Sequence, residues 1–125
     1  MIMLTKYQVA RLHYMLLSAT GGLDGVRDIF LLESAIDSAF QTWEGEEMYP
    51  SMQEKFCRIA FNIAKNHPFL DGNKRIAVLT MLFLLKINNI EITYTQDELI
   101  KIGLGLADGT INYESLLLWV KTHIK

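Results

Sequence analysis

His67-Pro68-Phe69-Leu70-Asp71-Gly72-Asn73-Lys74-Arg75 joins two apolar segments of the chain. Pro68 has no N–H group and disfavours the helical conformation for the residue before it, so the first segment is predicted to be a helix ending by about Asn66. His67 is then expected to be extended and to point out of a loop. Asp71-Gly72 is a turn signal, and the unbroken apolar run after it predicts a second helix with Asp71 as its N-cap.

The start of that second helix is a predicted anion site. The first N–H groups of a helix lack internal partners, and the helix dipole places partial positive charge at the same end. Lys74 and Arg75 in the first turn oppose that dipole, at a cost of about a few tenths of a kcal/mol each, unless an anion is bound. Their position therefore favours phosphoryl oxygens as the ligand.

Each of these side chains also has an ordinary structural explanation. Asp71 would serve only as a cap, Asn73 would only fix the turn, and Lys74-Arg75 would be a solvated helix face. Phe69 differs, because an aromatic ring between polar neighbours is expected to fill the core and anchor the loop. We interpret Phe69 as structural and keep both explanations open for the others.

The stretch resembles the signature of the Fic/Doc family, His-x-Phe-x-Asp/Glu-x-Asn-x-Arg, and Lys74 before Arg75 is similar to the Doc (death-on-curing) branch. The resemblance covers nearly the whole chain, from Gly21-Gly22 through Leu31-Leu32-Glu33 and Tyr49-Pro50 to the segments after residue 75. It implies an all-α fold. The expected structure is a compact bundle of about six helices around a central apolar helix, with a short flap strand or hairpin.

Length and composition restrict the class of protein. The 125 residues are predicted to form a single Fic/Doc-like domain, residues 1–125, and the net charge of −2 argues against direct nucleic-acid binding. Cys57 is the only cysteine, which suits a reducing compartment. The run Ile76–Leu85 is too short for a membrane span and no signal peptide is visible, so we expect a cytoplasmic protein without a membrane partner.

Capping signals and apolar periods predict the remaining helices. We expect a first helix from Thr5 to about Ala19, a second capped by Asp28, a third opened by the capping box Ser51–Glu54, a fourth along Ile76–Leu85, a fifth from the capping box Thr95–Glu98 to about Ala107, and a last one capped by Asn112. The predicted buried faces are Val9, Leu12, Leu16 and Ala19 in the first, Ile29, Leu32, Ile36, Ala39 and Trp43 in the second, and Met52, Phe56, Ile59, Ala60 and Ile63 in the third.

Three further segments carry specific expectations. His13, between apolar neighbours, is interpreted as a packed, hydrogen-bonded histidine rather than a ligand. Gly103–Gly109 lacks the strand and spacing of a nucleotide loop, so its small residues are expected to permit close helix packing. The acidic connector 44–50 is either a solvated linker or, by the resemblance, a flap that docks a target segment, with Ile90–Tyr94 near it.

The predicted chemistry is phosphoryl or nucleotidyl transfer. His67 is the expected catalytic base for a target hydroxyl, because a neutral imidazole can take its proton near neutral pH. Asp71 would hold Mg²⁺, which commonly takes one or two carboxylates together with substrate phosphates. The ATP phosphates would be bound by Gly72, Asn73, Lys74 and Arg75 at the helix N-terminus.

The residue at position 74 helps to predict which phosphorus atom of ATP the target hydroxyl attacks. The nucleotidyl-transferring branch typically has glycine there, so Lys74 favours transfer of the γ-phosphate of ATP to a Ser or Thr hydroxyl. Pro68 and Gly72 are more similar to the AMP-transferring branch, which leaves a Fic-type adenylyltransferase as an alternative. A non-catalytic helical module that binds a nucleotide or partner is the second alternative.

The Doc resemblance further implies biological partners. It implies a toxin of a type II toxin–antitoxin system, with a translation elongation factor such as EF-Tu as protein substrate and a small Phd-like antitoxin as inhibitor. The chain shows no internal Ser/Thr-x-x-x-Glu-Gly/Asn inhibitory helix. We therefore expect regulation by a separate protein, whose amphipathic helix would occupy a groove.

Overall fold

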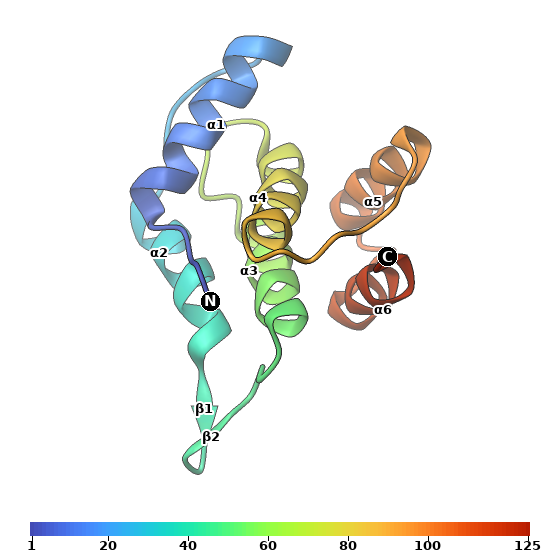
Figure 1. The fold of residues 1–125 in the computed structure, drawn as a ribbon. Helices are drawn as coiled ribbons and strands as arrows, with labels where there is room; N and C mark the ends of the chain where they lie inside the picture. The colour runs from blue at the N-terminus through green and yellow to red at the C-terminus, as the bar shows by residue number, and fades with distance from the viewer.

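The computed structural model describes all 125 residues as a bundle of six α-helices with a small β-hairpin (Figure 1). The helices are α1 (Lys6–Thr20), α2 (Ile29–Asp37), α3 (Met52–Asn66), α4 (Asn73–Ile87), α5 (Gln96–Asp108) and α6 (Tyr113–His123). A 3-10 turn, η1 (Ser38–Phe40), follows α2, and the hairpin consists of β1 (Thr42–Trp43) and β2 (Glu46–Glu47). The all-α class predicted from the sequence is confirmed.

Helices α3 and α4 occupy the centre of the bundle. Helices α2 and α6 pack on α3, and α1 and α5 pack on α4. The largest fully buried side chains of the central pair are Phe56, Ile59, Ile63, Ile76, Met81, Leu84 and Leu85. Helix α4 is thus the predicted central helix, but it shares the centre with α3 and keeps Leu79, Leu82 and Phe83 partly exposed. No helix is both long and apolar enough to cross a membrane.

The predicted capping residues begin five of the six helices. Thr5, Ser51 and Thr95 each form a complete capping box, in which the side chain three residues later also accepts from the cap's own N–H. Asp28 accepts from the N–H groups of two residues in the first turn of α2, and Asn112 accepts from that of Ser115. These local hydrogen bonds fix the helix starts independently of packing.

Two predicted buried faces need correction. In α1 the buried residues are Val9, His13 and Leu17, while Ala19 is exposed, because the helix turns its last residues toward solvent. Helix α2 ends at Asp37, and Trp43 lies in β1 with 71% of its surface exposed. The apolar period therefore does not continue as a helix past η1.

The connector after α2 forms the predicted short hairpin. Thr42 pairs with Glu47 and Trp43 with Glu46, and the turn residues Glu44 and Gly45 both have positive φ, as a tight hairpin turn requires. The buried Lys55 ammonium of α3 holds the base of the hairpin through Glu47 Oε1 at 2.8 Å and the carbonyl of Tyr49.

The hairpin lies far from the stretch 67–75. It precedes the N-terminus of α3 and His67 follows the C-terminus, which places about 22 Å of helix between them. Figure 1 shows the hairpin and the start of α4 at opposite ends of the central pair. The expectation that Ile90–Tyr94 lies near the hairpin is wrong, because Ile92 pairs with Ile124 and Thr93 N–H donates to the His123 carbonyl at 2.9 Å.

The glycines of α5 offer a test of close packing. A Cβ added at Gly105 would lie 2.4 Å from Ile111 Cδ1, whereas one added at Gly103 would meet nothing within 4 Å. We predict that Gly105→Ala lowers the free energy of unfolding by about 1–3 kcal/mol through overpacking. Gly103→Ala should raise it by about 0.5–1 kcal/mol through reduced chain entropy. Urea denaturation measures both, and equal effects of the two substitutions would contradict the packing argument.

Candidate active site

The stretch begins where α3 ends, and its first residue differs from the prediction. Helix α3 stops at Asn66 as predicted, but His67 is left-handed rather than extended, with φ 52° and ψ 59°. His67 N–H still donates to the Ile63 carbonyl at 3.2 Å, and the left-handed residue then turns the chain out of the helix at Pro68. The His67 side chain is exposed.

Arg27 completes this helix end and was not identified from the sequence. Its Nε donates to the His67 carbonyl at 2.7 Å and an Nη2 donates to the Asn66 carbonyl at 2.9 Å. The backbone N–H groups of Arg27 and Asp28 both donate to the Pro68 carbonyl, next to an isolated bridge between Val26 and Phe69. A contact across 40 residues leaves no periodic signal, so only the Gly-rich loop before Arg27 hinted that this segment had a special path.

Phe69 and Asn73 close the loop. The Phe69 ring is 1% exposed and stacks on His13, with ring centroids 3.9 Å apart. The Asn73 side chain holds both backbone groups of Phe69: its Oδ1 accepts from the N–H at 2.9 Å and its Nδ2 donates to the carbonyl at 3.0 Å. Asn73, expected to contact phosphate, therefore directs its amide into the loop.

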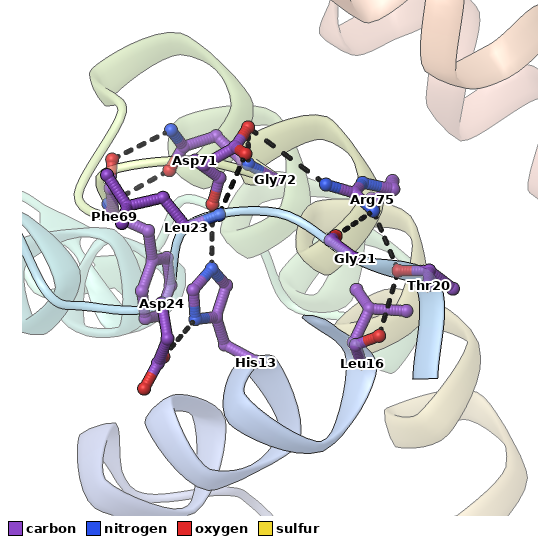
Figure 2. A network of polar contacts seen from close by, with 11 residues as sticks. His13, Leu16, Thr20, Gly21, Leu23, Asp24, Phe69, Asp71, Gly72 and Arg75 are labelled. Carbon is purple, nitrogen blue, oxygen red and sulfur yellow. Dashed lines mark hydrogen bonds and ion pairs between the residues drawn. The ribbon is translucent and has the colours of Figure 1, made fainter. Parts of the chain in front are cut away.

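The prediction that Asp71 is the N-cap of α4 is wrong. Gly72 occupies the N-cap position with φ 74°, and the Asp71 carboxylate instead accepts from Gly72 N–H at 2.7 Å and Leu23 N–H at 3.2 Å (Figure 2). The Leu23 and Gly72 N–H donors hold the pKa of this carboxyl below its ordinary value, and Arg75 adds to the effect. The side chain is 49% exposed.

Arg75 and Lys74 carry the positive charge at the start of α4. Arg75 Nη1 donates to Thr20 Oγ1 at 2.7 Å and to the Gly21 carbonyl at 3.1 Å, so the guanidinium joins the end of α1 to the start of α4. Its Nη2 lies 4.0 Å from Asp71 Oδ1. Lys74 is exposed, and its charge is available to a ligand.

A cleft of about 780 Å³ opens at this helix start, between α1, α4 and α5. Its polar end is formed by residues 71–75, and its wall is formed by Leu16, Val78, Leu79, Leu82, Gln96, Leu99, Ile100, Gly103 and Leu104. The structure thus brings Asp71, Gly72, Asn73, Lys74 and Arg75 to one cavity. His67 and Phe69 are not among its lining residues.

The donor set fits a hard cation and an anionic ligand. An ionised carboxylate has about four lone-pair positions, and two of those on Asp71 are used by N–H groups, which leaves acceptors for Mg²⁺. The N-terminus of α4 and the Lys74 ammonium supply positive charge beside it. The fold and site together define a helical domain with a cleft at the N-terminus of one of its two central helices, where a carboxylate and two cationic side chains meet.

Comparison with known proteins assigns that domain to a family. Residues 3–85 match the model of the Fic/DOC family, and the chain belongs to this family. It is 35% identical over 74 residues to a protein named Toxin Doc from Mycolicibacterium smegmatis, an alignment that covers 59% of this chain. The chain spans 57% of the length of that relative.

The loop closure by Asn73 generates a prediction on stability. Asn73→Ala leaves the buried N–H and carbonyl of Phe69 without partners, which should lower the free energy of unfolding by about 1–3 kcal/mol. The neighbouring Lys74→Ala removes an exposed side chain and should change it by less than about 0.5 kcal/mol. Chemical denaturation of the two variants compares them directly. Equal losses would mean that the Asn73 amide does not hold the loop.

Proposed function

We propose that this protein is a Doc-like toxin that transfers the γ-phosphate of ATP to a Ser or Thr hydroxyl of a protein target. The observation that carries the proposal is the single cleft lined by residues 71–75 at the N-terminus of α4. Membership of the Fic/Doc family and similarity to a protein named Toxin Doc support it. A translation elongation factor such as EF-Tu is the proposed target, and its modification would block translation.

ATP and Mg²⁺ are the proposed cofactors. Asp71 would hold the metal, since it offers an ionised carboxylate with free acceptor positions at the cleft. Lys74, Arg75 and the first N–H groups of α4 would bind the phosphates beside Gly72, whose own N–H is bonded to Asp71, while Asn73 would keep this helix start in place. Preorganised positive charge of this kind stabilises the non-bridging oxygens during phosphoryl transfer.

His67 is the proposed base. Its imidazole is exposed at the end of α3, where a hydroxyl on a protein surface can reach it. It stands outside the cavity lined by 71–75, so the hydroxyl would approach from the solvent side of the loop while the nucleotide occupies the cleft. A base that deprotonates an attacking hydroxyl contributes about 10²–10⁴-fold to the rate.

The structure also bears on the AMP-transferring alternative. Gly72, one of the residues shared with that branch, has φ 74°, and a Cβ there would lie 2.9 Å from Leu17 Cδ2. Pro68, the other, is buried and its carbonyl accepts from Arg27 and Asp28. Gly72 therefore has a structural reason to be glycine, and the buried Pro68 ends the helical path after α3, which leaves Lys74 as the residue that bears on the proposed chemistry.

A labelling experiment separates the three functions. ATP labelled on the γ-phosphate or on the α-phosphate is incubated with the protein, Mg²⁺ and a cell extract. We predict protein-bound label from γ-labelled ATP only, and a loss of at least about a hundredfold for His67→Ala, which should fold normally because its side chain is exposed. Label from α-labelled ATP would indicate AMP transfer, and nucleotide binding without any label would indicate a binding module.

Lys74→Gly serves as the second arm of that experiment. We expect this variant to lose γ-phosphate transfer or to gain α-label, because the ammonium group no longer occupies the phosphate end of the cleft. Thermal denaturation provides the control: the variant should stay folded with a slightly lower melting temperature, because Lys74 is exposed and a glycine in a helix costs only about 0.5–1 kcal/mol. Phosphorylation at the parental rate by the variant would show that Lys74 does not select the reaction.

We also propose a Phd-like antitoxin as partner, with an amphipathic helix in the apolar part of the cleft. Ile100 and Leu104 of α5 line this part and expose 51% and 58% of their surfaces, as expected of a site that a partner covers. The product of a short reading frame beside the gene should bind the protein, and Leu104→Lys should weaken binding at least about tenfold by calorimetry. An unchanged affinity of the antitoxin for Leu104→Lys would show that its helix does not bind in this part of the cleft.

A further inference from the structure

His13 contacts the loop 67–72 from outside it. It lies in the middle of α1 with 1% of its surface exposed, and its ring stacks on Phe69 at an interplanar angle of 13°. Its Nε2 lies 2.7 Å from the carbonyl oxygen of Asp71, and its Nδ1 lies 3.4 Å from Asp24 Oδ1 (Figure 2). The imidazole is thus aimed at the backbone of the proposed metal-binding residue.

The direction of this hydrogen bond is fixed by chemistry. A carbonyl oxygen can only accept, so Nε2 carries the proton and donates to Asp71. Asp24 faces the opposite ring nitrogen from a half-exposed position. The Phe69 ring and α1 hold the imidazole plane, so Nε2–H has a defined direction.

This contact determines the orientation of the peptide between Asp71 and Gly72. In a trans peptide the C=O and N–H groups point to opposite sides, so holding the Asp71 carbonyl on His13 directs Gly72 N–H away from it. That N–H donates to Asp71 Oδ1 at 2.7 Å and pins the carboxylate. Gly72 tolerates both orientations of this peptide because it lacks a Cβ, so its own backbone preference does not select one.

We propose that His13 is a positioning residue, which orients the Asp71–Gly72 peptide and thereby aims the Asp71 carboxylate at the cleft. The inference rests on the proposed function only in assigning the metal to this carboxylate. The orientation of the peptide is a structural statement that holds or fails without any catalysis.

The structural arm of the test uses NMR on the full chain. In the unmodified protein, His13 should show a slowly exchanging Nε2–H resonance. His13→Phe keeps an aromatic ring against Phe69 but removes the donor, so the amide resonances of Gly72 and Leu23 should shift upfield as their bonds to Asp71 loosen. His13→Gln, whose Nε2–H reaches a similar position, should restore them, and His123→Phe is the matched control away from the site.

The catalytic arm asks whether the orientation matters for transfer. His13→Phe should need about tenfold more Mg²⁺ for half-maximal transfer, because a displaced carboxylate binds the metal less well, and His13→Gln should need a nearly parental concentration. Unmoved Gly72 and Leu23 amides in a folded His13→Phe variant would overturn the proposal. A rapidly exchanging Nε2–H resonance in the unmodified protein would overturn it even if no variant folds. If His13→Phe and His13→Gln needed the same Mg²⁺ concentration for half-maximal transfer, His13 would serve only in packing. Absence of transfer in the unmodified protein would count against the proposed function and leave the NMR result standing.

Discussion

The closure of the loop between α3 and α4 by Asn73 is the constraint on which the rest of the structure depends. Two hydrogen bonds from one side-chain amide hold the N–H and the carbonyl of Phe69, and this fixes the turn from one central helix into the other. The buried Phe69 ring then fills the space between α1 and the loop. Because the start of α4 is held in this way, its free N–H groups and charged side chains open on the cleft instead of fraying.

In the proposed mechanism, residues of the stretch 67–75 serve the fold and the chemistry together. Asp71 is pinned by backbone donors and still offers acceptor positions, and Arg75 joins α1 to α4 while lining the cleft. The structural and functional explanations, which the sequence leaves as alternatives, are therefore compatible for both residues. For Asn73 the structural role uses both ends of its amide, so its contribution to phosphate binding would come through the position of α4.

Local signals in the sequence predicted the helices well, because capping residues act within one turn of where they stand. Thr5, Asp28 and Ser51 all cap the helices expected of them. The errors arose where distant parts of the chain decide the conformation. The left-handed His67 has its carbonyl bonded to Arg27, 40 residues away, and the exposed Trp43 lies in a hairpin where the apolar period had predicted a helix. Burial of His13 was predicted, but its partner Asp71 was not, since 58 residues separate them.

The buried ammonium of Lys55 has a geometric consequence for recognition. It bonds the hairpin to the end of α3 opposite His67, so the hairpin projects from that end, away from the cleft. About 22 Å of helix separates the two, which corresponds to roughly seven residues of extended chain. A macromolecule that touches the hairpin and the imidazole at once must therefore present two distinct epitopes, which only a folded domain or a long docked segment can supply.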